Sequence, residues 1–196
     1  RVAGRYGAIS TATVRSSRRI ASASLSGYEA VLRGLHYDNT LNPTDLASAK
    51  RALESAVADD PMFASGWARL AILYLDAAAF GIDNFDQPLP RGIEYAERAA
   101  ALDPNSQDAH FASAWCRLLQ RDTDGVSRAA WKMVDLNPGE AFFVGSAGWF
   151  LALAGDRSKG LELIDRSRKL NPKYPTWFNL IPYLDSFNVG EFELAL

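Results

Sequence analysis

The stretch DPNSQDAHFASAWCRLLQRDTDGVSRAAWKMVDLNP, residues 103–138, decides the fold. It contains two helix-forming segments separated by the turn Arg121-Asp122-Thr123-Asp124-Gly125, whose Asp and Gly residues are of the kind that end one helix and cap the next. An Asp-Pro dipeptide opens the stretch and an Asn-Pro dipeptide closes it. Pro104, Pro138 and Pro172 follow one another at one constant interval, whereas the interval from Pro61 to Pro104 is longer. The sequence therefore predicts a repeated unit of two helices, with nine extra residues in one unit.

The constant interval matches the period of about 34 residues, with proline at a fixed phase, that is typical of the tetratricopeptide repeat, a stack of helix-turn-helix units. The segment Trp67-Ala68-Arg69-Leu70-Ala71-Ile72-Leu73-Tyr74 fits the W-x2-L-G-x2-Y opening of that repeat, with Ala in place of Gly. Gly148 holds the same small-residue position in the fourth unit, where two helices cross closely. We predict an all-α fold, a right-handed α-solenoid of tetratricopeptide helix-turn-helix repeats with an N-terminal extra helix. The alternative is a plain helical bundle, which gives no reason for four units in phase.

The domain organisation follows from the repeat, because a solenoid grows by adding neighbours to one continuous domain. Residues 1–24 are predicted to hold an N-terminal helix that ends a preceding segment, and residues 25–196 an array of about four repeats plus a truncated fifth. The extra residues are placed in a loop over 80–90 that is expected to project from one edge of the solenoid. A start at Arg1 and an end inside a helical pattern predict a fragment of a longer protein. Within the array, helices are expected over 25–39, 46–59, 107–120, 124–136, 141–154 and 156–170.

The amino-acid composition limits which binding partners and which cellular compartment we expect for this protein. A net charge of −2, from 21 basic and 23 acidic residues, predicts no nucleic-acid binding by this chain. The single Cys116 cannot form an internal disulfide, which favours a reducing, cytoplasmic location. No apolar run approaches the roughly 18 residues that a membrane span requires. Residues 1–27 contain five arginines and no acid; we interpret them as a solvated helix face rather than a transit peptide or a surface for nucleic acid or anionic lipid.

Catalytic residues are not recognisable in the sequence. His36 and His110 lie in different units, and no nucleophile with its base, carboxylate pair or metal cluster has suitable spacing. Asp83, Asn84 and Asp86 lack the central Gly and the closing Glu of a calcium loop. We therefore predict a protein that is not an enzyme and that needs no cofactor and no metal.

The concave face of such a solenoid is lined mainly by the first helix of each unit. By phase from the proline, this face is mostly aromatic and aliphatic, although Ser65, Asp76 and Asp108 also fall on it, and the Lys/Arg/Asn clamp of chaperone-binding relatives is absent. Such a lining favours a protein or peptide partner that offers an apolar or amphipathic helix. Self-association, or packing against the N-terminal helix or absent domains, remains the alternative. The predicted groove residues are Ile72, Leu75, Phe111, Trp115, Leu118, Phe142, Trp149 and Leu153.

Several segments go beyond the generic repeat and resemble the tetratricopeptide region of bacterial multidomain regulators. In that family an adenylate/guanylate cyclase domain or a winged-helix DNA-binding domain precedes a TolB-like segment and then the repeats, and Val2-Ala3-Gly4-Arg5-Tyr6-Gly7-Ala8-Ile9 resembles the last helix of the TolB-like segment. The resemblance implies a non-catalytic interaction and assembly module of a signalling protein. The regulatory region of a cyclase and the sensor region of a DNA-binding transcriptional regulator both stay open. The segments are Tyr28-Glu29-Ala30-Val31-Leu32-Arg33-Gly34, Asn42-Pro43-Thr44-Asp45, Ala56-Val57-Ala58-Asp59-Asp60-Pro61-Met62-Phe63-Ala64 and Leu170-Asn171-Pro172-Lys173-Tyr174-Pro175-Thr176-Trp177-Phe178.

Overall fold

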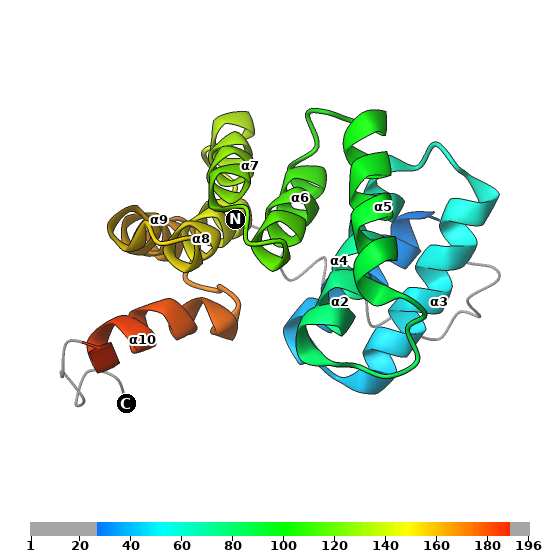
Figure 1. Ribbon diagram of the computed structural model, residues 1–196, viewed down its shortest axis with the longest axis horizontal. Coiled ribbons are helices and arrows are strands. Elements are labelled where there is room, and N and C mark those ends of the chain that lie inside the picture. The colour runs from blue at the N-terminus through cyan, green and yellow to red at the C-terminus, as the bar shows by residue number, and fades with distance from the viewer. Residues whose placement is uncertain (1–26, 189–196) are drawn as a thin grey trace.

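The computed structural model describes residues 27–188 of the 196-residue chain (Figure 1). The predicted N-terminal helix and the predicted start of a second helix in the fifth unit lie outside the described residues. Across residues 27–188 every regular element is a helix. The elements are α2 (Gly27–Thr40), α3 (Pro43–Asp59), α4 (Ala64–Phe80), α5 (Pro88–Leu102), α6 (Gln107–Leu119), α7 (Thr123–Leu136), α8 (Ala141–Leu153), α9 (Arg157–Leu170), the 3-10 helix η2 (Thr176–Asn179) and α10 (Leu180–Asn188).

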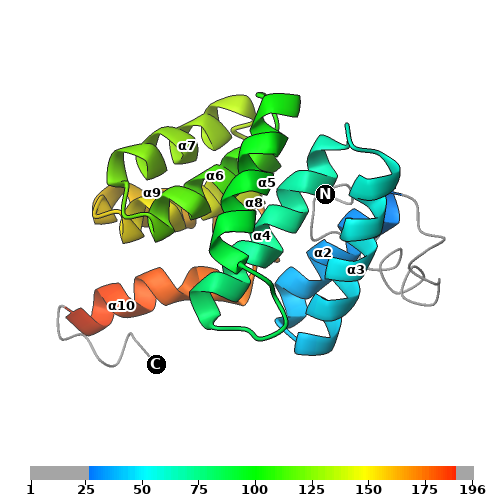
Figure 2. The same cartoon turned by 45° about the vertical axis from the view of Figure 1, so that its right-hand side comes forward.

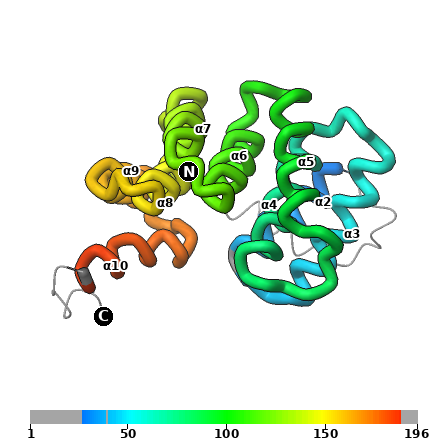
Figure 3. Tube along the Cα trace, in the orientation of Figure 1, coloured from blue at the N-terminus to red at the C-terminus, as the bar shows by residue number. Residues whose placement is uncertain are grey.

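Consecutive helices pack as pairs, α2 with α3, α4 with α5, α6 with α7 and α8 with α9 (Figure 2). The second helix of each of the first three pairs also contacts the first helix of the next pair, and the first helices α2, α4, α6 and α8 contact one another in sequence. This is the predicted right-handed solenoid of tetratricopeptide-type units, and the all-α fold class is confirmed. The trace in Figure 3 leaves α9, passes through η2 and continues into α10, whose Asp185 forms an ion pair with Arg157 at the start of α9.

The Asp-Pro and Asn-Pro dipeptides each close a helix in the same way. The residue before the proline lies in extended backbone, with φ of −130° at Asp60, −141° at Asp103, −153° at Asn137 and −146° at Asn171. Proline disfavours the helical conformation at the residue before it, which ends the helix. The Asp or Asn side chain then accepts a hydrogen bond from the backbone N–H two residues on, at 3.0–3.2 Å in all four turns. Local chemistry thus sets the phase of the repeat.

The nine extra residues of the second unit are not all in a loop. Four of them lengthen α4, which has 17 residues against 13 in α6 and in α8, and one lengthens α5. The remaining four extend the connection between the paired helices, which runs over 81–87 in this unit and over 120–122 in the next. Pro88 begins α5, since proline at the first helical position sacrifices no hydrogen bond.

The loop over 81–87 folds back onto α3 instead of projecting from the edge of the solenoid. Lys50 Nζ donates to the Asn84 carbonyl oxygen at 2.9 Å and lies 4.5 Å from the centre of the Phe85 ring. The Phe85 ring meets Tyr74 edge to face at 4.9 Å. Asp86 pairs with Arg91 at 2.7 Å. The predicted loop is therefore present, but it is shorter and more firmly attached than the sequence suggested.

Candidate functional site

A pocket of about 220 Å³ opens on the concave side of the solenoid, where α2, α4, α6 and α8 face η2 and α10. Apolar side chains from α4, α6 and α8 form most of its surface, and two carboxylates lie at one side. Trp177 of η2 and Leu180 of α10 complete the lining, so residues far apart in sequence meet here. The lining consists of Asp38, Leu41, Ile72, Asp76, Phe80, Phe111, Trp115, Phe142, Trp149, Phe150, Trp177 and Leu180.

The aromatic side chains of the pocket touch one another in a continuous wall. The rings of Trp115 and Trp149, which hold equivalent positions in consecutive units, meet edge to face at 5.7 Å between centroids. Trp149 meets Trp177 in the same way at 5.5 Å. Phe142 contacts Trp177 at 6.2 Å and stacks on Phe111 at 5.7 Å. Offset and edge-to-face contacts at these distances are favourable for aromatic pairs, so the wall is a packed surface of defined shape.

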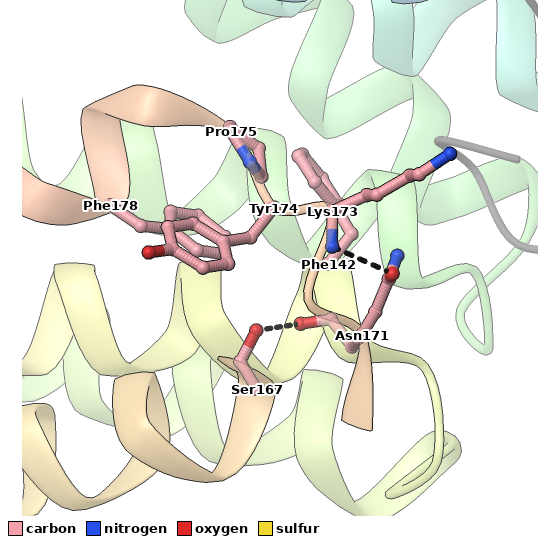
Figure 4. A pocket seen from close by; sticks show the side chains of 8 residues that line it. Phe142, Ser167, Asn171, Lys173, Tyr174, Pro175 and Phe178 are labelled. Carbon is pink, nitrogen blue, oxygen red and sulfur yellow. Dashed lines mark hydrogen bonds between the residues drawn. The ribbon is translucent and has the colours of Figure 1, made fainter. Parts of the chain in front are cut away.

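The fifth unit covers part of the aromatic strip that the sequence predicts on α6 and α8. Phe142, Trp115 and Phe111 are buried, while Trp149 is half-buried. In the segment that leads into η2, the Tyr174 and Phe178 rings stack on each other with planes 6° apart (Figure 4), and Phe178 also stacks on Phe142 of α8 at 6.2 Å. Phe178 is fully buried and occupies the space that a side chain at Gly145 would require. The covering residues therefore come from this chain, from a segment that sequence reasoning assigned only to the truncated repeat.

A buried charge network lies beside the pocket and joins three first helices. Arg69 of α4 is 1% exposed, and its guanidinium donates to both oxygens of Asp38 on α2 at 2.7 Å. The same guanidinium lies 3.8 Å from a carboxylate oxygen of Asp108 on α6. An arginine is almost never buried without such partners. The network was missed by sequence reasoning, because positions 38, 69 and 108 carry no signal of their proximity.

Asp76 stands at the boundary between the charge network and the aromatic wall. One of its carboxylate oxygens accepts a hydrogen bond of 2.9 Å from Trp115 Nε1. Burial raises the pKa of this carboxyl to about 7, and the Asp38 charge adds to the increase, whereas the Trp115 hydrogen bond and Arg69 oppose it. The pKa of this carboxyl therefore lies well above the range of an ordinary aspartate.

Five of the eight predicted groove residues line the pocket: Ile72, Phe111, Trp115, Phe142 and Trp149. Leu75 is fully buried and packs against Gly92 of α5, Leu118 is half-buried against the core, and Leu153 is 39% exposed. Sequence reasoning missed Phe80, which follows Asp76 by four residues and so lies on the same face of the lengthened α4. It also missed five further residues that line the pocket, namely Asp38, Leu41, Phe150, Trp177 and Leu180.

The surroundings of the His and Cys side chains can be described for residues 27–188. Across residues 27–188 no group of three or more His, Cys, Asp or Glu side chains could hold a metal ion. Burial raises the pKa of the Cys116 thiol to about 12, which keeps it protonated. His36 lies 3.4 Å from Asp45, and a ring nitrogen of His110 lies 2.8 Å from the Pro104 carbonyl oxygen. In residues 27–188 no helix is both long and apolar enough to cross a membrane.

The fold of the protein is therefore an α-solenoid of tetratricopeptide type, with an aromatic pocket on its concave side. The solved structure of MamA has this fold: it matches with a TM-score of 0.52 and 17% identity, over 83% of this chain and 87% of the MamA chain. No family model matches the chain. The transcriptional regulator HilA of Salmonella typhimurium and that of Salmonella typhi are each 28% identical to it over 142 residues. These residues are 72% of this chain, and the chain spans about a quarter (26%) of the HilA length.

Proposed function

We propose that this chain is a non-catalytic protein-interaction module whose concave pocket binds an apolar or amphipathic helix of a partner protein. The observation that carries the proposal is the aromatic wall, which remains partly open to solvent at Trp149, Trp177 and Leu180. A concave site lined by aromatic side chains with a few polar groups is the usual form of a binding pocket. Phe80, which is 67% exposed, extends the apolar surface beyond the pocket.

The wider role that we propose is assembly within a bacterial multidomain signalling protein. The resemblance of the repeats to those of cyclase-type and winged-helix regulators supports it. The match to HilA, a transcriptional regulator by name, favours the sensor region of a DNA-binding regulator over the regulatory region of a cyclase. Either role would use the pocket to bind another protein segment, while any catalysis or DNA binding would belong to other domains.

Self-association is the second candidate function, and α10 supports it. Tyr183, Leu184 and Phe187 are 44%, 38% and 51% exposed on this short helix. Among the described elements, α10 packs mainly against η2. An exposed apolar face of this kind often marks a contact surface, and Leu180 makes it continuous with the pocket.

Peptide selection tests the interaction function directly. A display library of random peptides of about 15 residues, long enough for about four helical turns, is selected against the folded chain. Affinities of the enriched peptides are then measured by fluorescence titration for the wild type, Trp149→Ala and Trp131→Ala. Both tryptophans are half-buried and pack against the same core cluster, but only Trp149 lines the pocket.

We expect amphipathic peptides whose affinity falls by about tenfold or more in Trp149→Ala, because buried aromatic anchors dominate interface energies. Trp131→Ala should bind them as the wild type does. Equal loss in both variants, or no enriched peptide at all, contradicts a peptide-binding groove. A chain that enriches no peptide but dimerises at micromolar concentration favours self-association instead.

A further inference from the structure

The pocket combines an aromatic wall with an excess of negative charge. Asp38 and Asp76 both line it. Arg69 pairs with Asp38, and its guanidinium also lies 3.8 Å from Asp108 on α6. This guanidinium is therefore already engaged, while two carboxylates line the same side of the groove. The opposite side, formed by α8, η2 and α10, contributes only apolar lining residues: Phe142, Trp149, Phe150, Trp177 and Leu180.

Asp76 is the carboxylate in this group that lacks an ion pair of its own among the described residues. Asp38 is held by two hydrogen bonds from Arg69 at 2.7 Å, whereas Asp76 accepts only the neutral Trp115 N–H. Burying a charge without a counter-ion is costly, and a carboxylate in this position tends to take up a proton instead. A cation that entered the pocket would remove that cost, so Asp76 is ready to receive one.

The aromatic wall offers the second half of a cation site. Phe80, Trp115, Trp149 and Trp177 form a chain of ring contacts with centroid separations of 5.5–6.5 Å. Tryptophan is the strongest cation–π partner, and the attraction increases where water is excluded. Lysine and arginine also carry an aliphatic stem that packs on apolar surface while the charged head reaches a polar group. An apolar pocket with one carboxylate at its side suits this kind of side chain.

We propose that the partner segment inserts one basic side chain, lysine or arginine flanked by apolar residues, into the pocket, with Asp76 as its counter-ion and Trp115 and Trp149 as its aromatic walls. This inference rests on the proposed function and specifies the chemistry of its partner. Charge complementarity is the argument for a basic residue. The apolar surface at Phe80 and Leu180, which a free amine would leave exposed, is the argument for a peptide segment rather than a small molecule.

The proposal predicts that the affinity for a basic peptide depends on pH, because Asp76 must lose its proton to bind a cation. The groups that interact with Asp76 are Tyr37 and Asp38 on α2, Arg69 on α4 and Trp115 on α6. The pKa of Tyr37 is raised by burial, so its phenol stays neutral. The pKa of Asp76, by contrast, is raised to about 7. A cation binds only to its deprotonated form, and affinity for a basic peptide should rise with pH through about 7 and then level off.

The experiment uses four display libraries of peptides of about 15 residues that share a randomised apolar face and differ only in a fixed central residue: Lys, Met, Gln or Glu. The tightest peptide of the Lys library is then synthesised with its central Lys and with Met in that place. Both are titrated into the ¹⁵N-labelled chain, and the indole N–H signal of Trp115, which donates to Asp76, reports occupancy of the pocket. n-Butylammonium, the head of a lysine side chain, is the small-molecule probe.

We expect the Lys library to be enriched most, and the Lys peptide to bind about tenfold more tightly than its Met counterpart at about pH 8, since an ion pair and a cation–π contact add to the same apolar contacts. The preference should shrink at about pH 6, where Asp76 is protonated. Asp76→Asn, which keeps an acceptor for Trp115, should abolish the preference but not Met-peptide binding. Asp135→Asn, the same change on an exposed residue of α7, should leave both affinities unchanged.

The outcomes separate this inference from the proposed function. A Met peptide that binds as tightly as the Lys peptide overturns the inference and leaves the interaction module intact. Libraries from which no peptide is enriched contradict the module itself. n-Butylammonium that binds as tightly as the Lys peptide overturns the partner segment and indicates a receptor for small amines. If Asp76→Asn does not fold, the wild type still decides, because a Lys preference that is constant between about pH 6 and about pH 8 excludes Asp76 as the counter-ion.

Discussion

Two contacts between helices of this solenoid are held together by different chemistry. We call the contact of α2, α4 and α6 the charged joint and the contact of α8 and α9 the glycine joint. Where α2, α4 and α6 meet, the buried Arg69 binds Asp38 and approaches Asp108. Where α8 meets α9, the two backbones approach closely at a pair of glycines: a Cβ placed on Gly148 would lie 2.5 Å from the Gly160 carbonyl oxygen. The repeat geometry therefore sets the spacing of the helices, but it does not determine which residues form the contact between them. The stability of the charged joint should depend on pH and on the pairing of specific side chains. The stability of the glycine joint should depend only on how closely the two helices approach.

Removal of Arg69 should have the largest effect on stability. Arg69→Met keeps most of the side-chain volume but leaves Asp38, which is 11% exposed, without its counter-ion. Breaking a buried ion pair by removing one partner typically costs about 3–5 kcal/mol. Urea unfolding monitored by circular dichroism should show a loss of this size. Arg128→Met, at an exposed position of α7, is the matched control and should cost less than about 0.5 kcal/mol.

A second substitution shows whether the loss reflects unpaired charge or lost packing. Asp38→Asn in the Arg69→Met background removes one stranded carboxylate, so the double variant should be more stable than the sum of the single losses predicts. Strict additivity of the two substitutions would mean that Arg69 acts through its packing, and that the charged joint is no different in kind from the glycine joint.

The two joints also differ in how much of each could be predicted from the sequence. Gly148 stands at a fixed phase from Pro138, so its role in a close crossing follows from the repeat alone. The helix ends were predictable for the same reason: the helix expected over 107–120 is Gln107–Leu119. Arg69 shares its unit with the best-matching repeat segment, but its partners lie in the unit before it and the unit after it. A repeat pattern identifies residues that recur in every unit. The residues of the charge network do not recur, so the pattern could not identify them.

The groove was predictable to the same extent and for the same reason. Phe111, Trp115 and Trp149 were found because they recur at equivalent positions of first helices. Trp177 was not assigned to the groove, because the fifth unit begins as the 3-10 helix η2 and then turns into α10. Leu75 was assigned to the groove by phase, but the structure places it in the contact between α4 and α5 next to Gly92. A helix position one residue away from the concave stripe can face the paired helix instead.

Asp76 should make the charged joint sensitive to pH, with the next largest effect. Its folded pKa of about 7 exceeds the ordinary value of 3.8. The protonated form is thus favoured by folding, and this contribution to stability is complete below about pH 4 and lost as pH rises through about 7. The free energy of unfolding of Asp76→Asn relative to wild type should therefore increase between about pH 4 and about pH 8, by on the order of 3–4 kcal/mol.

Chemical denaturation of both proteins across this pH range measures the difference and cancels the other titrating groups that the two share. The glycine joint contains no such group among its contacts, so Gly160→Ala should show a stability deficit that does not change with pH. A difference between Asp76→Asn and wild type that stays flat from about pH 4 to about pH 8 would mean that the Asp76 carboxyl has an ordinary pKa.

The glycine joint should respond to volume alone, with the smallest of the three effects. A Cβ at Gly148 would also lie 3.0 Å from the Ile164 backbone nitrogen and from the Leu163 Cβ. Because two of these neighbours are backbone atoms, the helices must separate to admit even one methyl group, and overpacking of this kind costs about 1–3 kcal/mol. Gly148→Ala should lie at the lower end of that range and Gly148→Leu at the upper end, as measured by thermal unfolding. Gly139→Ala is the control, since its Cβ would meet only the Asn137 side chain at 3.6 Å. If Gly148→Ala melts at the wild-type temperature, the α8 and α9 helices are not held by close approach, and the phase assigned to the fourth unit is wrong.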